Sequence, residues 1–277
     1  QARRHILELL LSEHRAECTT CYKNGKCELQ NLTSEYIVGG SEFLPLIEEK
    51  SYTVDMFSPS IIKDDSKCIR CQRCVRTCLE LQDVGALTVA YRGEDMKIST
   101  FFENPMNDVV CTNCGQCVNR CPTGALTERT YIDEVWNAIY NPEKHVVVQT
   151  APAVRVALAE ALGHEPGEIV TGKMVSALRR LGFDSVLDTD FTADLTIIEE
   201  GHELLSRLKG ALKDKDPDVK LPMTTSCSPG WIKFIEHRYP QFLPNLSTCK
   251  SPQQMFGALA KTFYAEKRKL NPEKVVS

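Results

Sequence analysis

The segment CIRCQRCVRTC, Cys68 to Cys78, has its cysteine spacing repeated in CTNCGQCVNRCP, Cys111 to Pro122. Both segments follow the pattern C-x2-C-x2-C-x3-C. Three thiolates at this spacing can wrap one loop around three irons of a four-iron cubane and aim backbone N–H groups at its sulfides, while the fourth cysteine points away from the loop. The repeat therefore predicts one module with two four-iron sites.

The fourth cysteine of each motif is expected to ligate the cluster of the other motif. The second motif ends in Cys121-Pro122, as in bacterial two-cluster ferredoxins, so an α+β ferredoxin-like module is expected. Zinc is the alternative, but zinc sites usually pair two C-x2-C knuckles across a longer gap. The expected ligand sets are Cys68, Cys71, Cys74 and Cys121 for one cluster, and Cys111, Cys114, Cys117 and Cys78 for the other.

A third group of cysteines lies in EHRAECTTCYKNGKCEL, residues 13–29, and is one ligand short of a four-iron site. Spacing alone leaves His14 open between a ligand and a surface bystander. As a neutral fourth ligand it would raise the reduction potential of the cluster, as histidine does in Rieske centres. The expected ligands are His14, Cys18, Cys21 and Cys27, and a helix over residues 2–18 with a packing stripe at Ile6, Leu7, Leu10 and Leu11 would present His14 near its end.

Composition and charge exclude several classes of protein. The chain has 277 residues, 42% hydrophobic and 25% charged, with a net charge of -4, so it offers no basic field for nucleic acid. No apolar stretch approaches the roughly 20 residues of a spanning helix, and no signal peptide is recognisable. A disulfide framework is typical of small secreted chains, whereas here 11 of 13 cysteines lie before residue 122. These features predict a cytoplasmic protein with a metal-rich first half, and neither a nucleic-acid nor a membrane partner.

The second half of the chain alternates strand and helix patterns. Strands are expected at HVVVQT (145–150), SVLDTD (185–190) and the start of LPMTTSCSPGW (221–231), with helices between them. This alternation predicts an α/β unit with a mostly parallel sheet, whose ligands bind where strands end. The predicted domains are 1–60, which includes a loop-rich connector from residue 31, then 61–140 and 141–277.

Several segments resemble FeFe hydrogenases. TSCSPGW (225–231) is similar to their first active-site signature, usually Thr-Ser-Cys-Cys-Pro-x-Trp, and TAPAVR (150–155) resembles their active-site entry strand. FTADLTIIEEGHELLSRL (191–208) resembles a helix on their proton route, and LSTCKSPQQMFGALAKTFYAEK (246–267) the segment after the signature. The order H-x3-C-x2-C-x5-C before a two-cluster module also occurs in complex I and some formate dehydrogenases, and it implies that His14 is a ligand. The second half then favours the N-terminal half of a hydrogenase H-cluster domain.

The resemblance implies the residues of a proton route and of a cofactor pocket. The thiol of Cys227 exchanges protons readily, since a free cysteine has a pKa near ~8.5. Glu200, Glu203 and Arg207 share one helix face, although without the resemblance an ordinary solvated face with ion pairs is the favoured interpretation. The implied route is Cys227, Glu200, Ser247, Glu203 and Arg207, and the implied pocket is Ala151, Pro152, Ala153, Ser228, Pro252 and Gln253.

Two departures from the family pattern stand out. Ser228 replaces the second signature cysteine, which in the family holds the four-iron part of the H-cluster. The chain also ends where the later signatures should begin and starts inside an expected helix, which suggests a longer subunit. Cys249 is expected to be a small packed residue.

The predicted function is the catalytic subunit of an FeFe hydrogenase, an oxidoreductase that interconverts H2 with protons and electrons. The implied cofactors are three 4Fe-4S clusters and, in the complete subunit, the H-cluster with its two-iron subsite. The implied partners are ferredoxin, flavin- and NAD(P)-binding iron-sulfur subunits, as in electron bifurcation, and maturation enzymes. The alternatives are a non-catalytic electron-transfer subunit and a hydrogen sensor.

Overall fold

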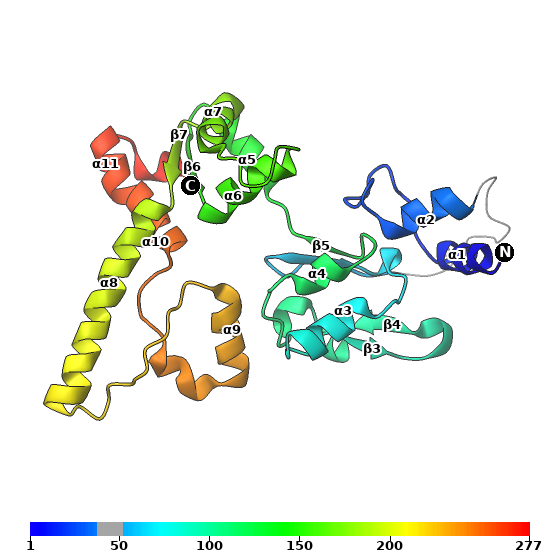
Figure 1. Cartoon of the computed structure of the whole chain (residues 1–277), viewed down its shortest axis with the longest axis horizontal. Helices are drawn as coiled ribbons and strands as arrows, with labels where there is room; N and C mark the ends of the chain where they lie inside the picture. The colour runs from blue at the N-terminus through cyan, green and yellow to red at the C-terminus, as the bar shows by residue number, and fades with distance from the viewer. Residues whose placement is uncertain (38–51) are drawn as a thin grey trace. The chain divides into compact units, whose positions relative to one another are not determined.

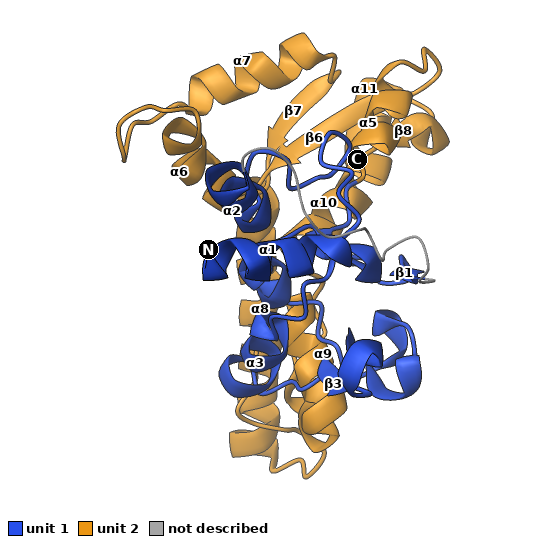
Figure 2. Ribbon diagram, turned by 90° about the vertical axis from the view of Figure 1, so that its right-hand side faces the viewer, with its two compact units in different colours: residues 1–130 blue, residues 131–277 orange. Residues whose placement is uncertain are grey.

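The computed structural model describes residues 1–37 and 52–277, which divide into two compact units, Gln1–Thr130 and Tyr131–Ser277 (Figure 2). Residues 38–51 of the predicted connector lie outside the described residues. The contacts divide the chain at residue 130, before the predicted boundary at residue 140. The division into three domains remains a prediction.

Unit 1 begins with two helices, α1 (Ala2–Ser12) and α2 (Glu28–Tyr36), shown in blue in Figure 1. Leu7 on α1 packs with Leu29 on α2 in a small buried cluster. The prediction of a helix to residue 18 was wrong, because the Ser12 hydroxyl bonds the Leu9 carbonyl at 2.8 Å and the Arg15 N–H donates to the Ser66 carbonyl at 3.0 Å. His14 therefore lies in the turn after the helix.

The predicted packing stripe on α1 is only partly correct. Leu7 is 6% exposed, and Leu10 and Leu11 pack against the same cluster. Ile6, however, is 58% exposed, because the core contacts of α1 fall on the face that carries Leu7.

The rest of unit 1 is a small α+β module. Its three-stranded antiparallel sheet has the order β1-β2-β5, and β3 and β4 form a separate antiparallel pair. Two short helices, α3 and α4, lie inside the two cysteine motifs. The bounds are β1 (Val54–Asp55), β2 (Ile61–Asp64), η2 (Asp65–Lys67), α3 (Arg73–Arg76), η3 (Thr77–Leu81), β3 (Thr88–Ala90), η4 (Gly93–Asp95), β4 (Lys97–Ser99), η5 (Phe101–Glu103), η6 (Met106–Asp108), α4 (Gln116–Arg120) and β5 (Leu126–Glu128).

The two cysteine loops have matching backbone conformations. The N–H of Arg70 points to Cys68 Sγ and that of Asn113 to Cys111 Sγ, each at 3.4 Å. Left-handed residues recur at equivalent places in both loops, which is what turns the chain around a central volume. These residues are Arg70 (φ 54°), Gln72 (φ 62°), Asn113 (φ 57°) and Gly115 (φ 72°). The two loops therefore share one backbone conformation, and the expectation that their N–H groups point at the sulfides of a cluster stays a prediction.

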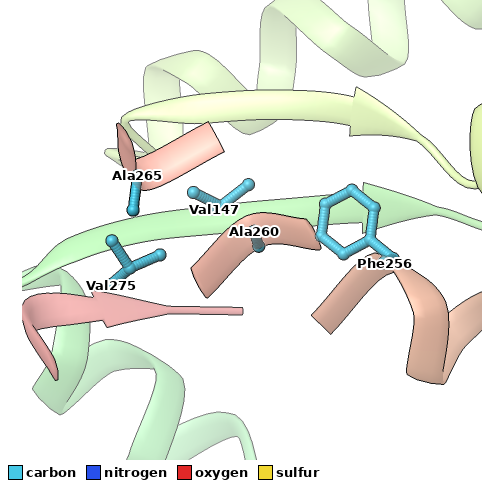
Figure 3. Close-up of a cluster of buried hydrophobic side chains, with 5 residues drawn as sticks. All are labelled: Val147, Phe256, Ala260, Ala265 and Val275. Atoms are coloured by element: carbon cyan, nitrogen blue, oxygen red, sulfur yellow. The ribbon is translucent and has the colours of Figure 1, made fainter. Parts of the chain in front are cut away.

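Unit 2 contains a parallel sheet of order β7-β6-β8, with β6 (His145–Thr150) in the centre. The neighbouring strands are β7 (Ser185–Asp188) and β8 (Val275–Val276). One face of β6 packs on the C-terminal helices, where five side chains form a buried cluster (Figure 3). The cluster consists of Val147, Phe256, Ala260, Ala265 and Val275.

Helices surround this sheet, as the alternating pattern predicted (Figure 1). The bounds are α5 (Ile132–Ile139), α6 (Pro152–Ala161), α7 (Thr171–Leu181), α8 (Asp190–Leu208), η7 (Lys209–Asp214), α9 (Pro229–Arg238), η8 (Pro240–Asn245), α10 (Pro252–Leu259), η9 (Ala260–Tyr264), α11 (Ala265–Arg268) and η10 (Pro272–Lys274). No described helix is both long and apolar enough to cross a membrane.

The predicted strand in residues 221–231 was wrong. Only Thr224 forms a bridge, a parallel one to Leu246. Pro222 and Pro229 cannot donate to a ladder, and Pro229 instead occupies the first turn of α9, where a missing N–H costs nothing.

Candidate metal centres and proton-transfer site

The first candidate metal centre lies in the turn after α1, where residues 14–27 close around a cavity. His14 Nδ1 is buried and has no hydrogen-bond partner among the described residues, while the ring donates to the backbone carbonyl of Lys67. Burial, followed by the charge of Lys67, lowers the pKa of His14, so the imidazole is neutral at pH 7 and has a lone pair to offer. The four predicted ligands, His14, Cys18, Cys21 and Cys27, all line this cavity.

Two further cavities lie inside the ferredoxin-like module. In each of them three lining cysteines come from one motif and the fourth comes from the other, as cross-ligation requires. One cavity is lined by Cys68, Cys71, Cys74 and Cys121, and the other by Cys78, Cys111, Cys114 and Cys117. These are the two ligand sets expected from the repeat.

The buried thiols of these two cavities resist ionisation while no metal is bound. Burial, followed by the neighbouring Cys68 thiolate, raises the pKa of Cys74 to about 12. Burial also raises the pKa of Cys68 and of Cys117. The free thiols are therefore protonated at neutral pH, and iron must displace those protons, so metal binding here releases protons and depends on pH.

The ligand geometry fits a cluster better than a single ion. In residues 1–37 and 52–277, no group of three His, Cys, Asp or Glu side chains converges closely enough to hold one metal ion. A zinc site needs four ligands within about 2.3 Å of one point. A cubane has its irons at separate corners, so its ligands surround a volume, as they do in these cavities. None of the 13 cysteines, all of which lie among the described residues, forms a disulfide, so disulfide pairing does not compete with metal ligation.

In unit 2, the carboxyl ends of β6 and β7 meet at one edge of the sheet. Thr150 pairs with Asp188, and Arg155 on α6 forms an ion pair with Asp188 at 3.0 Å. Parallel sheets bind ligands at such an edge. Ala151 precedes α6, which begins at Pro152. The predicted pocket residues at this edge are Ala151, Pro152 and Ala153, and all three are exposed.

The other predicted pocket residues are brought together by two extended segments. Residues 224–226 run parallel to residues 245–249, because the Ser247 N–H donates to the Thr224 carbonyl at 2.7 Å and the Ser226 hydroxyl to the Cys249 carbonyl at 3.0 Å. The pairing joins the turn before α9 to the turn before α10 (Figure 1). These turns carry Cys227, Ser228, Pro252 and Gln253.

Ser228 occupies the N-cap position of α9. Serine is a favoured N-cap because its hydroxyl can accept a backbone N–H, yet Ser228 makes no such bond. The neighbouring Cys227 is exposed. The oxygen of Ser228 is thus free to meet a cofactor, and this fits the predicted pocket.

Three of the five predicted proton-route residues form one continuous hydrogen-bonded line. The Ser247 hydroxyl, in a residue only 6% exposed, donates to Glu203 Oε2 at 2.7 Å. Arg207 donates to Glu203 Oε1 from Nη2 at 2.6 Å and from Nε at 3.0 Å. Arg207 also donates to the carbonyls of Pro244 and Leu246, at 3.1 and 2.8 Å, and so fixes the segment that carries Ser247.

The two glutamates of this helix face have opposite electrostatics. Hydrogen bonds from Ser247 and Arg207 outweigh burial, the largest single contribution, and hold the pKa of Glu203 below its ordinary value of 4.5. Burial, followed by repulsion from Glu203, raises the pKa of Glu200 above the same value. Glu203 is therefore the fixed anion, and Glu200 is the carboxyl more easily protonated.

The structure does not connect every predicted member of the route. Among the described residues of unit 2, no hydrogen bond joins Cys227 or Glu200 to the line formed by Ser247, Glu203 and Arg207. Cys227 lies near the line only through the pairing of residues 224–226 with residues 245–249.

Two contacts of Glu203 were missed from the sequence. The backbone N–H of Thr248 donates to Glu203 Oε2 at 3.0 Å, and Cys249 Sγ lies 3.6 Å from the same oxygen. The Cys249 N–H also donates to Ser247 Oγ at 3.1 Å. The prediction of Cys249 as a packed residue was incomplete, because its thiol faces a carboxylate. Its position two residues after Ser247 was the available signal.

The cysteine-lined cavities and the fold point to a protein with iron-sulfur domains. Residues 3–42 match the model of the NADH-ubiquinone oxidoreductase-G iron-sulfur binding region. Residues 58–127 match that of the NADH-quinone oxidoreductase subunit 3 ferredoxin-like domain, and residues 144–277 that of the iron only hydrogenase large subunit, C-terminal domain.

Individual proteins similar to this chain are also hydrogenases. The chain is 54% identical over 275 residues to the NADP-reducing hydrogenase subunit HndD of Solidesulfovibrio fructosivorans, with 99% of this chain and 46% of that protein covered. It is 40% identical over 267 residues to iron hydrogenase 1 of Clostridium pasteurianum, with 96% and 45% covered. A solved FeFe hydrogenase structure, concerned with oxygen inactivation of the H cluster, is 47% identical with a TM-score of 0.51, covering 53% of this chain and 37% of that one.

These matches confirm the family expected from the sequence: residues 144–277 belong to the iron-only hydrogenase large subunits, behind iron-sulfur domains of the NADH-G and ferredoxin-like types. The named relatives are hydrogenases, which are oxidoreductases. The chain spans about half the length of these relatives.

Proposed function

We propose that the chain is part of the catalytic subunit of an FeFe hydrogenase, which interconverts H2 with two protons and two electrons. The observation that carries the proposal is the line from Ser247 through Glu203 to Arg207, beside the turn that carries Cys227. A proton-transfer line of this kind is expected in a subunit that turns over protons, and an electron-transfer subunit does not require one. The hydrogenase relatives support the same reading.

The residues of this chain fit the cofactors of such a subunit. The His14 site and the two cross-ligated sites would hold three 4Fe-4S clusters, which supply one-electron transfer when bound. The turns at Ala151, Ser228 and Pro252 would form one wall of the H-cluster pocket. The protein contributes ligation, orientation and a defined dielectric environment, while the H-cluster supplies the chemistry that cleaves or forms H2.

The side chains of unit 2 would move protons. Cys227 has an exposed thiol, and thiols as a class are more acidic than serine hydroxyls. Glu200, with its raised pKa, can hold a proton, and the Ser247 hydroxyl, which donates to Glu203 Oε2, can pass a proton on only as its oxygen takes up another. Arg207 keeps Glu203 ionised and oriented, so Oε2 is always ready to accept.

The partners are proposed by analogy with relatives. The name of the Solidesulfovibrio relative includes NADP reduction, and the first two domains match models of NADH oxidoreductase subunits. We therefore propose NAD(P)- and flavin-binding partner subunits, with ferredoxin as a second electron partner and maturation enzymes for assembly. The cytoplasmic location remains a prediction.

The test is carried out on the whole subunit, produced anaerobically with maturation enzymes. Infrared bands of carbonyl and cyanide ligands should be present, and Cys227→Ala should lower hydrogen turnover by about 10²-fold or more with those bands retained. Glu200→Gln should lower turnover as well, whereas Glu199→Gln, an exposed neighbour on α8, serves as the matched control. A subunit that has its 4Fe-4S clusters but neither bands nor turnover would refute the catalytic assignment.

A further inference from the structure

The turn that follows Cys121 belongs by sequence to the ferredoxin-like module, yet it lies against the His14 site. The Pro122 carbonyl accepts the N–H of Glu28, the first residue of α2, at 3.0 Å. Gly124 lines the His14 cavity, and Cys121 lines the neighbouring one. One short turn is therefore a wall common to two candidate metal centres.

Thr123 is the buried residue at the centre of this turn. It is 1% exposed, and its hydroxyl donates to the Lys67 carbonyl at 2.7 Å. The same backbone carbonyl accepts from the ring of His14. Lys67 immediately precedes Cys68, a proposed ligand of the other cluster. A single peptide group thus fixes both the ring of His14 and the first cysteine of the repeat.

Gly124 is required by space and not by backbone conformation. It does not have the left-handed φ that favours glycine, but a Cβ there would lie 2.7 Å from Cys21 Sγ. Real Cβ atoms do not approach another atom so closely. Cys21 is itself a proposed ligand, so its sulfur cannot retreat without leaving the cavity wall.

We propose that Thr123 and Gly124 are positioning residues for the His14 metal centre: Thr123 fixes the carbonyl that orients the imidazole, and Gly124 makes room for the Cys21 sulfur. Partners of ligating histidines in general fix the orientation of the ring and tune its basicity. The inference rests on the proposed assignment of a cluster to His14, Cys18, Cys21 and Cys27. It makes the His14 site dependent on the module that follows it.

The first experiment uses Gly124→Ala in the complete subunit with its clusters. The variant should lose about four irons per chain together with the paramagnetic resonance signal of the His14 cluster, while the other clusters keep their signals. Retention of those signals shows that the module has folded. Gly172→Ala is the matched control, because a Cβ there meets nothing within 4 Å. A Gly124→Ala subunit with full iron and an unchanged His14 cluster signal would overturn the role of Gly124.

The second experiment compares Thr123→Val, which removes the hydroxyl, with Thr123→Ser, which keeps it. The reduction potential of the His14 cluster, followed by paramagnetic resonance during a redox titration, should shift in the valine variant and return in the serine variant. Equal potentials in wild type and Thr123→Val would refute the role of Thr123. His14→Ala tests the assignment of His14 as a ligand. If the cluster assigned to His14, Cys18, Cys21 and Cys27 were unchanged in that variant, the ligand assignment itself would be refuted.

Discussion

The two units place their functional residues in opposite ways. In unit 1 each proposed metal centre takes at least three ligands from one short loop, and the residues that fill the interior include the ligands themselves, such as Cys27, Cys74 and Cys117. In unit 2 the Ser247 to Arg207 line joins residues about forty positions apart, on a loop and a helix. The residues of a metal site can therefore be set by the spacing within one loop, whereas a proton route depends on the packing of elements that are distant in the sequence.

The largest predicted effect is the loss of unit 1 without loss of unit 2 when iron is removed. Four proposed ligands, Cys27, Cys74, Cys111 and Cys117, are buried within unit 1 beside its apolar residues, and metal-binding energy is folding energy in such domains. Anaerobic chelation should accelerate amide exchange in β2 and β5 by at least about 10³-fold. Exchange in β6 and β7 should change little, because Val147 and Phe256 pack in an apolar cluster. Equal loss of protection in both units would abolish the contrast between them.

The second prediction concerns the arginine that fixes the unit 2 line. Arg207→Ala leaves the half-buried carboxylate of Glu203 without its ion-pair partner and the carbonyls of residues 244 and 246 without donors. We expect a loss of about 3 kcal/mol from the free energy of unfolding of unit 2, read from its urea midpoint. Lys209→Ala, an exposed residue two positions further along, is the control and should change it by less than about 0.5 kcal/mol. Equal effects would mean that the line does not contribute to stability.

The third prediction uses pH to separate the two glutamates. The folded-state pKa of Glu203 lies below 4.5, so its contribution to stability is present above that pH and is lost as the pH falls through the folded pKa. Glu203→Gln should therefore flatten the decline in stability between about pH 5 and pH 3.

Glu200 should show the opposite sign. Its folded-state pKa is raised, so its ionised form destabilises unit 2 at neutral pH and this cost disappears as the pH falls. Glu200→Gln should raise the thermal midpoint of unit 2 at pH 7 but have no stabilising effect near pH 4. Parallel pH profiles for the two variants would contradict the electrostatic difference between the glutamates.

The smallest predicted effect compares the two cysteine loops within unit 1. Gln72 and Gly115 occupy equivalent left-handed positions, and only Gly115 does so without strain. Gly115→Ala should cost about 1 kcal/mol, since a Cβ there meets no atom within 4 Å and the backbone strain is the only penalty. Gln72→Gly should recover a similar amount. Denaturant unfolding of the iron-loaded protein measures both, and effects of equal sign would show that the loops are not equivalent.

The grouping of cysteines in unit 1 could be predicted from the sequence, because the repeat has the spacing that a cubane requires and the structure brings the same two sets around two cavities. The end of α1 could not be predicted, because the Arg15 N–H donates to the carbonyl of Ser66, about fifty residues away in the sequence, and not to a carbonyl of the helix. Gly124 was also missed, since its need for space is set by Cys21, which lies about one hundred residues earlier in the sequence.

In unit 2, the strand at 145–150, the parallel pairing and the long helix followed from hydrophobic periodicity, while the strand expected at 185–190 ends at Asp188 because α8 begins at Asp190. The expected strand near Thr224 did not form, because prolines on both sides limited it to one bridge. Periodicity placed Glu200, Glu203 and Arg207 on one helix face but could not show that only Glu203 and Arg207 are joined to Ser247.

The sequence by itself determined the kind of chemistry. The cysteine spacings indicate iron-sulfur ligation because thiolates must reach the corners of one cubane from a short loop. Only the tertiary structure decided how the sites depend on their surroundings. It leaves Nδ1 of His14 without a hydrogen-bond partner among the described residues, and it brings the His14 ring and the Thr123 hydroxyl to the same Lys67 carbonyl. It also keeps Glu203 negatively charged. Burial and the donors of distant residues set these properties, and neither can be read from local spacing.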